Sequence, residues 1–590
     1  MRDYILYKLH QSANILTDDI LEVVLTNRGV KDIETYKNPP NDVIIHYSKL
    51  KDIDKAVALF DKYKGTTIPF VVDSDMDGQT SSALFCKFIN DNFSDIKLIP
   101  LFHSGKQHGL DKAILAQIEE LASIEDIKLV IAIDAGTNDL QAHLQLNDIG
   151  IETLIIDHHN VEINTDDSPA VIVNNQISPE YANEELSGVG MSLKFVQALA
   201  DYYELDFNDK DYLDLVAMGM VTDSMSLIEH PETRKLIVDG FDNINNNVLL
   251  ELGKKVFGNY GTEVTSNNFS FKLAPKINAT IRYGHQDDKI DLFRALCGED
   301  EMSTRVWRGE TKTENLGQKV ARVSINTHKR QNKTKSDLMN EIDEQIKSRG
   351  LNKNRFIVAT MENNPKYRLL TGLVAGSIAS KYKKPCLILH PNGNGTFNGS
   401  LRGYDNLMTD TRDFLLETGL FNFVSGHQNA AGVSINTVNL EKLNEVLNEK
   451  LKDVELEEET LVDFVLDSKD VTPELIQEVH NLEKYWGKNV DAPLFAIENL
   501  EINIDEIDNG KNNNVTKYYD NEILYAKFVY DEGLMQYKGK TVTVNLLGKL
   551  SVNSFLGKDD YQVAIQDYEI VGVKDAPVKS KFGFDINDLF

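Results

Sequence analysis

The stretch VVDSDMDGQTSS, residues 71–82, places three aspartates at alternating positions directly after the apolar run TIPFVV. That run is rich in β-branched and aromatic residues, which is typical of a buried strand. If the strand continued through Asp73, Asp75 and Asp77, their side chains would share one face about 6.6 Å apart. Carboxylates at that spacing repel by about 2–3 kcal/mol per pair at an effective dielectric near 20. A bound cation would remove this repulsion, and an Asp-Gly turn with incidental acids is the alternative.

Residues 67–175 alternate strand and helix patterns in the order of βαβ units. TIPFVV, DIKLIPLF, IKLVIAI and ETLII are near-continuous apolar runs, which are typical of parallel strands buried on both faces. DKAILAQIEELASI and SSALFCKFINDNF have the apolar spacing of helices. Ligands bind at the carboxyl ends of the strands in such sheets, so the residues that follow each run are the candidates for a site.

Carboxylates and imidazoles gather at that predicted edge. Besides the three aspartates after TIPFVV, they are Asp134 after IKLVIAI, Asp157, His158 and His159 after ETLII, and Asp223 in GMVTDS. Oxygen ligands with one or two imidazoles suit Mn²⁺ or Mg²⁺, and two such ions can activate a water and clamp a phosphate. A single aspartate after a strand is often a helix N-cap, and adjacent loop histidines are often surface residues. Four such segments on one sheet edge favour a metal centre.

The composition narrows the class of protein. The 590 residues include 41% hydrophobic and 26% charged residues, as in ordinary globular proteins. With 62 basic and 92 acidic residues the net charge is −30, which argues against a passive electrostatic coat for nucleic acid. The three cysteines are far apart, which fits a reducing compartment and argues against a zinc-thiolate site. No apolar run or leader pattern predicts a membrane span or a signal peptide, so we expect the cytoplasm of a bacterium or a phage-infected cell.

The length predicts three or four domains. The second α/β unit has strand patterns RFIVATM, PCLILH and AAGVSI, and the acidic run DVELEEET follows it. Short strand patterns with Gly and Asn turns after that run predict a small closed OB-type barrel. The predicted domains are an N-terminal segment and catalytic domain (1–285), a helical connector (286–350), the second α/β unit (351–455), the OB-like domain (456–575) and a flexible tail (576–590).

Several motifs resemble one known family, the DHH phosphoesterases. DSDMDG, AIDAG, DHH and VTD are similar to its four motifs, in the same order. LSGVGMSLKF, YLDLVAMGMVTD and LAPKINATIRYG are similar to segments of the RecJ-type exonucleases within that family. GSLRG and SGHQNAAGVSI resemble the DHH-associated domain, whose Gly-Gly-His loop binds substrate. The resemblance covers roughly residues 65–435 and implies an α/β fold, in which a parallel-sheet DHH domain and a DHH-associated domain precede the OB-type barrel.

The resemblance also implies roles for individual residues. Two divalent cations, with Mn²⁺ expected first and Mg²⁺ as the alternative, would be held by Asp73, Asp75, Asp77, Asp134, His158 and Asp223. Among these, Asp134 would bridge the two ions. His159 would face the scissile phosphate, and Asp157 would orient the histidine pair. The phosphate and the terminal nucleotide would be held by Asn278, Arg282, Ser400, Arg402, Gly426 and His427. A salt bridge on the strand face is the alternative for Arg402.

The chain also departs from the family pattern. The first glycine of the Gly-Gly-His loop is Ser425. In the segment HSGKQHGL, residues 103–110, His103 and His108 stand where RecJ proteins typically have an arginine and a tyrosine. These changes put DNA contacts of that segment in doubt, and Lys106 is expected to compensate in part.

The resemblance to RecJ-type exonucleases, together with the predicted OB-type domain, implies a 5′-to-3′ exonuclease that acts on single-stranded DNA in repair, recombination or replication. A phosphodiesterase of nano-RNA or of linear or cyclic dinucleotides is the first alternative, and a non-catalytic replication scaffold is the second. The aromatic residues Tyr525, Phe528, Tyr530, Tyr537 and Phe555 could stack on bases or fill the barrel core. The basic stretch THKRQNKTK (327–335) could line the strand's path or be a solvated helix face. We expect a monomer whose tail contacts replication or repair proteins, with simple disorder of the tail as the alternative.

Overall fold

The computed structural model describes residues 7–10, 19–103, 107–258, 263–404, 410–452, 460–510, 515–555 and 558–576. They form two compact units. The first comprises Met1–Ala274, Asp291–Ala321 and Glu459–Phe590, and the second Pro275–Ile290 and Arg322–Glu458. Within the described ranges, no helix is both long and apolar enough to cross a bilayer. The C-terminal tail that we predicted to bind partners lies outside the described residues, apart from Ala576.

A five-stranded parallel sheet in the order β3-β2-β4-β5-β6 forms the centre of the first unit. Its strands are β2 (Thr67–Val72), β3 (Lys97–Phe102), β4 (Leu129–Ile133), β5 (Glu152–Asp157) and β6 (Val171–Asn174). The predicted parallel sheet is confirmed, and β2 to β5 coincide with the four apolar runs. The order reverses between β2 and β4, which is the position where doubly wound sheets open a ligand site.

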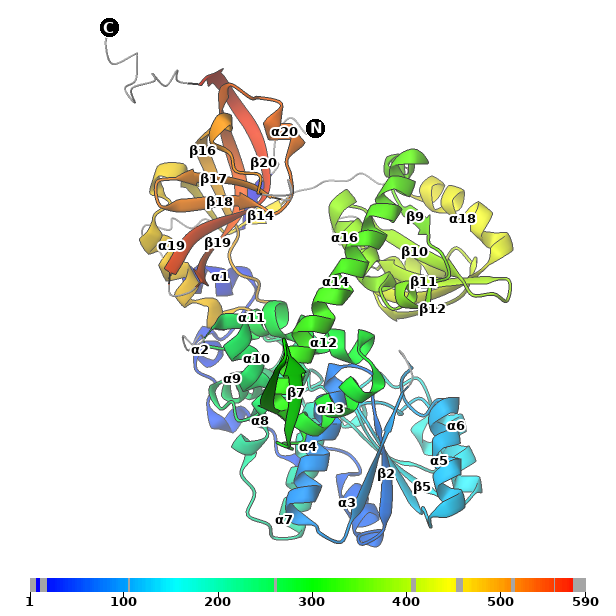
Figure 1. Cartoon of the computed structure of the whole chain (residues 1–590). Coiled ribbons are helices and arrows are strands. Elements are labelled where there is room, and N and C mark those ends of the chain that lie inside the picture. Colours follow the sequence, from blue (N-terminus) through cyan, green and yellow to red (C-terminus); the bar gives the residue numbers. More distant parts are fainter. Residues whose placement is uncertain are drawn as a thin grey trace. The chain divides into compact units, whose positions relative to one another are not determined.

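Helices cover both faces of this sheet (Figure 1). The helices of this region are α3 (Ile53–Lys62), α4 (Met76–Asn92), α5 (Lys112–Ile124), α6 (Leu140–Asp148), α7 (Gly188–Tyr202), α8 (Leu213–Thr222), α9 (Pro231–Asp242) and α10 (Asn247–Phe257). On the face of α5 and α6, Ile114 and Ile118 pack with Val71 and Val130 of the strands in one buried cluster. On the face of α4 and α7, the rings of Phe85 and Phe195 stack 6.1 Å apart. Both faces are apolar, as the near-continuous strand runs predicted.

The helical connector contains an element that the sequence reading missed. Helix α13 (Gln286–Leu296) is followed by a hairpin of β7 (Met302–Trp307) and β8 (Glu310–Asn315), and then by the 33-residue helix α14 (Leu316–Ser348). The two turn residues, Arg308 and Gly309, both have positive φ, of 52° and 82°. Such a pair matches the right-handed twist of the strands it joins. The Arg-Gly pair was the signal in the sequence from which this hairpin turn could have been predicted.

The C-terminal sheet belongs to the first unit. Its six strands, in the order β15-β16-β19-β20-β18-β17, are β15 (Phe464–Asp467), β16 (Phe495–Asn503), β17 (Thr516–Asp520), β18 (Ile523–Lys527), β19 (Lys540–Phe555) and β20 (Lys558–Asp575). The edge strands β15 and β17 do not pair with each other in the described residues, so the sheet is open where the sequence predicted a closed barrel. Helix α1 (Ile20–Asn27) and the short parallel pair β1 (Tyr7–Leu9) with β14 (Thr460–Val462) join the N-terminal segment to this region.

The second unit is a mixed five-stranded sheet in the order β12-β13-β11-β10-β9. Its strands are β9 (Ile357–Thr360), β10 (Cys386–Pro391), β11 (Thr396–Arg402), β12 (Phe421–His427) and β13 (Ala430–Asn436), and its helices include α12 (Ala274–Tyr283), α16 (Thr371–Tyr382), α17 (Thr411–Leu416) and α18 (Thr437–Lys450). Ile342 and Ile346 of α14 pack with α16 on one face, and Leu443 and Leu447 of α18 pack on the other. The predicted second α/β unit is confirmed, while the exact domain boundaries stay a prediction.

Candidate metal centre and phosphate-binding residues

The three aspartates of the opening stretch do not share the face of a strand. Strand β2 ends at Val72, and helix α4 already begins at Met76. Asp75 is the N-cap of that helix and accepts a hydrogen bond from Gly78 N at 3.2 Å, while Asp77 lies in the first turn. Our assumption of an extended backbone through Asp77 is therefore wrong. A capping carboxylate accepts from a backbone N–H group of the first helical turn that would otherwise have no partner. The helix therefore begins here, and the strand does not continue.

Asp77 is buried and held by the start of α7. Its carboxylate accepts hydrogen bonds from Gly188 N at 2.7 Å, Ser187 Oγ at 3.0 Å and Val189 N at 3.3 Å. Burial, with the charge of Asp75 as the next cause, raises the pKa of Asp77 to about 6. The helix N-terminus fixes the orientation of the side chain, so one oxygen can face the neighbouring acids.

Asp134 lies directly after β4 with a left-handed backbone, at φ 63°. Its N–H donates to the carbonyl of Ile156 at 2.8 Å, so the residue turns the chain at the sheet edge. Its Oδ1 is buried and has no hydrogen-bond partner among the described residues. Burial, and after it the charge of Asp77, raises the pKa of Asp134 well above its usual range. A buried carboxylate without donors costs several kcal/mol unless a cation or a proton neutralises it.

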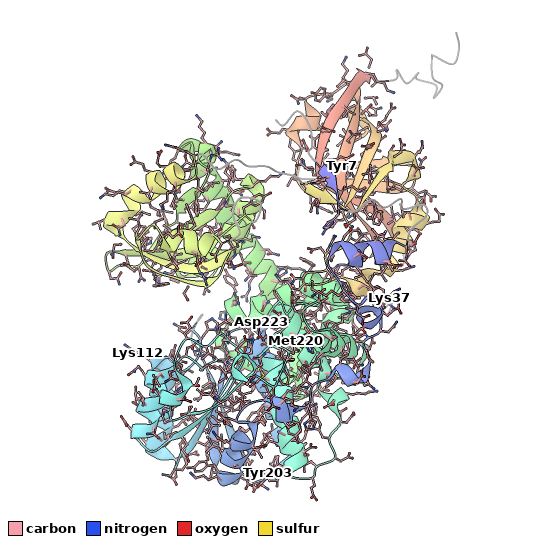
Figure 2. All side chains as sticks on the ribbon, turned by 180° about the vertical axis from the view of Figure 1, so that it is seen from behind. Tyr7, Lys37, Lys112, Tyr203, Met220 and Asp223 are labelled. Atoms are coloured by element: carbon pink, nitrogen blue, oxygen red, sulfur yellow. The ribbon has the colours of Figure 1, made fainter. Side chains whose placement is uncertain are left out.

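His158 brings three of the carboxylates together. Its Nε2 lies 3.2 Å from Asp134 Oδ1, 3.4 Å from Asp223 Oδ2 and 3.9 Å from Asp77 Oδ2. Asp223 follows the C-terminal end of α8, where it is labelled beside Met220 in Figure 2. Burial and the charges of Asp77 and Asp75 raise the pKa of Asp223 well above its usual range. The structure thus gathers side chains from β4, β5, α4 and α8 at one point.

His159 and Asp157 form a second layer beside this cluster. Asp157 is buried and accepts from His159 Nδ1 at 2.8 Å, from the backbone N–H of His158 at 2.7 Å and from that of Thr137 at 3.0 Å. Burial opposes its charge, but the hydrogen bond and charge of His159 hold the pKa of Asp157 well below its usual range. Burial likewise opposes a charged His159, yet Asp157 raises the pKa of that imidazole to about 9. This is the arrangement that an orienting role for Asp157 requires.

The donor set fits a pair of divalent cations. Two overlapping groups, Asp134–His158–His159 and Asp77–His158–Asp223, each have their donor atoms within 4.8 Å of one another. Ligands about 2.1 Å from one ion lie about 3.0–3.4 Å apart, which is close to the His158 distances above. Carboxylates with imidazole suit Mn²⁺ well and Mg²⁺ acceptably, and no thiolate lies in either group. The unpartnered Asp134 oxygen is the atom that such an ion would satisfy.

Asp73, the sixth predicted ligand, is buried, and its carboxylate faces residues of the segment 103–110. Its Oδ2 lies 2.6 Å from His108 Nδ1, and its Oδ1 accepts from Gly109 N at 3.2 Å. With Asp75 and His108 it forms a third group whose donor atoms lie within 4.8 Å. The sequence reading assigned this histidine no ligand role. Lys106, which we expected to compensate for the changed segment, lies outside the described residues.

The six predicted phosphate-binding residues all belong to the second unit. Arg282 is exposed on α12, which also carries Asn278, and Arg402 ends β11. Burial lowers the pKa of Arg402, and the charge of Arg282 lowers it further, so the two guanidinium groups lie within electrostatic range. Among the described residues, no ion pair joins either guanidinium group to a carboxylate. Two adjacent guanidinium groups favour an anion.

The remaining three residues lie on β11 and β12, the two strands that flank β13 in the sheet. Ser400 Oγ is 2.8 Å from Thr371 Oγ1 of α16, and Gly426 precedes the tight β12–β13 turn with φ 132°. A Cβ at Gly426 would lie 2.6 Å from the carbonyl oxygen of Ala430, so only glycine fits. The side chain of His427 lies outside what the structure describes, although its backbone is in β12.

The aromatic residues of the C-terminal sheet divide between core and surface. Tyr525 is 1% exposed and fills the core, whereas Phe528 is 65% and Tyr530 38% exposed. Tyr537 is half-buried, and the side chain of Phe555 is outside the described set. Only Phe528 and Tyr530 are therefore clear candidates for stacking on bases.

Sequence reasoning missed the residues that hold the acids in place, chiefly Ser187, Gly188 and Gly219. A Cβ on Gly188 would collide with Asp134, and one on Gly219 would collide with Asp77. Ser187 occupies the N-cap position of α7, and a Ser-Gly pair before an apolar helical repeat was the available signal. Nothing local in the sequence links these glycines to acids more than 50 residues away.

Comparison with known proteins gives two family matches. The model of the DHH family, N-terminal domain, matches residues 67–220, and that of the RecJ OB domain matches residues 462–567. The second match supports the OB type of the open C-terminal sheet.

Individual relatives cover most of the chain. A putative SPbeta prophage-derived single-strand DNA-specific exonuclease, YorK, of Bacillus subtilis is 35% identical over 94% of this chain and 97% of its own length. The single-stranded-DNA-specific exonuclease RecJ of Escherichia coli is 24% identical over 81% of this chain and 82% of its own. The crystal structure of RecJ from Thermus thermophilus in complex with Mn²⁺ has a TM-score of 0.70 at 17% identity, covering 95% of this chain and 77% of that one. This last likeness shows the shared fold.

Proposed function

The chain belongs to the RecJ group of the DHH family, and from that premise we propose that it is a metal-dependent exonuclease of single-stranded DNA. We propose that it degrades the strand from the 5′ end and releases mononucleotides, in DNA repair, recombination or replication. The observation that carries the proposal is the position of His158, whose Nε2 lies 3.2–3.9 Å from three carboxylates of three different elements. Such a cluster has no evident purpose in a scaffold, because ion-free it costs stability.

In this proposal Asp73, Asp75, Asp77, Asp134, His158 and Asp223 hold two divalent cations, Mn²⁺ or Mg²⁺. When bound, such a pair supplies Lewis-acid polarisation of the phosphodiester and a water nucleophile at neutral pH. Asp157 occupies Nδ1 of His159, which leaves Nε2 of that half-exposed imidazole as the nitrogen that can donate to a phosphate oxygen. With a pKa raised to about 9, His159 carries that proton at neutral pH before ions bind.

The second unit supplies the residues that would bind the phosphate of the terminal nucleotide. We assign this role to Arg282 and Arg402, supported by Asn278, Ser400, Gly426 and His427. A second positive group joins α12 and α14, where burial, and after it the charges of Lys276 and Lys335, lower the pKa of His328. These charges stand out in a chain of net charge −30 and would neutralise backbone phosphates. The exposed Phe528 and Tyr530 would stack on bases of the strand.

The test uses purified protein, Mn²⁺ and four end-labelled substrates, with Asp134→Asn as the inactive control. The substrates are a 5′-phosphorylated single strand of DNA, the same strand in a duplex, the matching RNA and a dinucleotide. We expect mononucleotides from the 5′ end of the single strand, and none from the Asp134→Asn protein. Cleavage of the dinucleotide alone would replace the proposal with a small-substrate phosphodiesterase. Absence of Mn²⁺-dependent cleavage on all four would favour a scaffold.

A cytoplasmic location and a monomeric state remain part of this proposal. The small number of cysteines and their wide spacing along the sequence support a reducing compartment. Size-exclusion chromatography with light scattering would test the monomer, and a mass near twice 66.5 kDa would contradict it.

A further inference from the structure

The turn that carries Asp223 has an unfavourable backbone conformation. Helix α8 ends one residue before Asp223, and Ser224 is left-handed with φ 61°. Met225 N donates to the carbonyl oxygen of Met220 at 3.1 Å, and Ser224 N donates to that of Val221 at 3.3 Å, which is the Schellman pattern of a helix end. Glycine is the usual residue at the left-handed position, because a Cβ is strained there. The turn therefore needs support from its surroundings to keep one conformation.

The two residues that follow this turn are buried and are held from two sides. They are Ser226 and Leu227, and Glu185 of the catalytic region accepts from Ser226 N at 2.8 Å. The other side is the C-terminal region, residues 460–576. There, Asn489 Nδ2 donates to Ser226 Oγ at 2.9 Å, and the carbonyl oxygen of Lys488 accepts from Leu227 N at 3.2 Å. All of these residues belong to the first unit, so the contacts lie within one compact body.

The contacting segment of the C-terminal region is a tight turn that precedes β16. Gly487 and Val490 exchange two backbone hydrogen bonds, each of 3.0 Å, and close the turn. Asn489 has φ 65°, a left-handed conformation that asparagine tolerates better than most residues. A Cβ on Gly487 would lie 2.5 Å from Leu227 Cδ1, so the turn approaches Leu227 more closely than a larger residue allows. The turn 487–490 is therefore fitted to the chain that follows Asp223.

We propose that the turn 487–490 of the C-terminal region positions Asp223 for metal binding, with Asn489 as a positioning residue that acts through Ser226. This inference rests on the proposed function, because it takes Asp223 as a metal ligand. Fixing Ser226 leaves only the two residues between it and Asp223 free to adjust. A ligand must be held within about 0.5 Å of its productive position, so a looser turn weakens metal binding. The region that carries the exposed Phe528 and Tyr530 would thereby also support the metal centre.

The test measures Mn²⁺ affinity of the full chain from the electron paramagnetic resonance signal of the free ion. Asn489→Gly removes the donor to Ser226 and keeps a residue that accepts φ 65°. The matched control is Asn521→Gly in the same region, where φ is 51° and the side chain donates to the neighbouring Asp520. We expect Mn²⁺ binding about 3–10-fold weaker for Asn489→Gly, the effect of one hydrogen bond, and unchanged binding for the control.

A second measurement combines Asn489→Gly with Ser226→Ala. Both changes remove the same hydrogen bond, so the double variant should bind Mn²⁺ as each single variant does.

A contact that only holds the C-terminal region in place would lower the urea midpoint in a chelator and leave the Mn²⁺ affinity of Asn489→Gly unchanged. That result, or equal weakening in Asn521→Gly, would overturn the proposal. If Asn489→Gly weakens Mn²⁺ binding but the natural protein cleaves no substrate, the proposed function is refuted and this inference stands. If the natural protein cleaves DNA and Asn489→Gly binds Mn²⁺ normally, only this inference is refuted.

Discussion

At the scale of single residues, the candidate centre is a set of acids whose charges are unfavourable without a cation. Burial raises the pKa values of Asp77, Asp134 and Asp223, and the charge of Asp75 raises all three further. Asp157 is the exception, because His159 and three backbone N–H groups compensate its charge. The protein therefore separates acids that need a cation from one that orients a histidine.

We expect Asp134→Asn to abolish Mn²⁺-dependent cleavage. The loss of activity should be well above the roughly 10–100-fold loss that is typical when a residue hydrogen-bonded to a metal ligand is changed. Asparagine tolerates the left-handed backbone at φ 63°, so the variant changes charge without adding strain. Without metal its melting temperature should equal or exceed that of the natural protein, because a buried charge is gone. Differential scanning fluorimetry with and without Mn²⁺ measures this, and a full Mn²⁺-induced rise in the variant would contradict the ligand role.

The free energy of unfolding of the metal-free protein should fall as the pH rises from about 5 to 9. Asp77, with a pKa raised from 3.8 to about 6, contributes stability below pH 3.8 that is lost through pH 6. His159, raised from 6.5 to about 9, contributes stability below pH 6.5 that is lost through pH 9. Urea unfolding in a chelator at pH 5.5 and 8 tests this, with an expected loss of about 1–3 kcal/mol. Asp77→Asn should remove the part of the loss centred near pH 6.

At the scale of elements, the ends of helices α4 and α7 set the geometry of the acids. Asp75 caps α4, and the first N–H groups of α7 hold Asp77. The close approach of α7 to the sheet edge requires Gly188, where a Cβ would collide with Asp134. A helix terminus thus positions two acids that lie 57 residues apart in the numbering of the printed sequence.

Gly188→Ala should displace Asp134, weaken Mn²⁺ binding at least about 10-fold and lower activity in proportion. The matched control is Gly253→Ala in α10, where the nearest atom to an added Cβ lies at 4.0 Å. That change should raise the free energy of unfolding by about 0.5–1 kcal/mol, because alanine favours a helix interior over glycine. Isothermal titration with Mn²⁺ and urea unfolding measure the two effects. Equal metal affinity of Gly188→Ala and the natural protein would refute the steric argument.

In the second unit, the elements α12 and β11 bring Arg282 and Arg402 within electrostatic range. Arg402→Gln should raise KM for a 5′-phosphorylated strand by about 10-fold or more, since a desolvated charge-assisted contact is lost. The Mn²⁺-induced rise in melting temperature should not change. Arg368→Gln is the control, because that guanidinium is already bonded to Asn363. An unchanged KM for Arg402→Gln would remove this arginine from the site.

At the scale of the whole chain, the N-terminal segment ties the catalytic region to the C-terminal sheet within the first unit. Arg28 makes a bidentate pair with the buried Asp463, with both N–O distances at 2.8 Å, and Asn27 adds a bond of 2.9 Å to the same carboxylate. Arg234 of α9 donates to the backbone of Tyr36 and of Lys484. The N-terminal helices therefore contact the catalytic region and the C-terminal region together.

Asp463→Ala should lower the free energy of unfolding by about 3–5 kcal/mol, because it leaves Arg28 partly buried without its partner. The pKa of Asp463 is lowered, chiefly by Arg28 against the effect of burial. The Asp463 carboxylate therefore contributes to the free energy of unfolding at pH values above its ordinary pKa. This contribution is lost as the pH falls and the group becomes protonated. Limited proteolysis should cut the N-terminal segment faster in the variant. A matched change at the exposed pair Lys540 and Asp575, Asp575→Ala, should leave the free energy of unfolding nearly unchanged, because solvent screens an exposed ion pair.

The sequence by itself determined the parallel sheet and the second α/β unit, and it singled out the acids and histidines that the structure brings together as a candidate metal centre. Apolar runs encode buried strands, and carboxylates after those runs must meet at one edge of a parallel sheet. The order of the four motifs along the chain then indicated the family, because motifs keep their order even where the segments between them differ. These are properties of single elements or of their succession along the chain.

Only the tertiary structure decided where Asp75 and Asp77 lie, which glycines make room for the acids, and how Arg28 reaches Asp463. The early start of α4 depends on a capping bond that competes with strand extension, and such a bond contributes only about 1 kcal/mol. The approach of His103 and His108 to Asp73 likewise joins residues of two strand ends. Contacts between residues far apart in sequence depend on packing that no local pattern encodes.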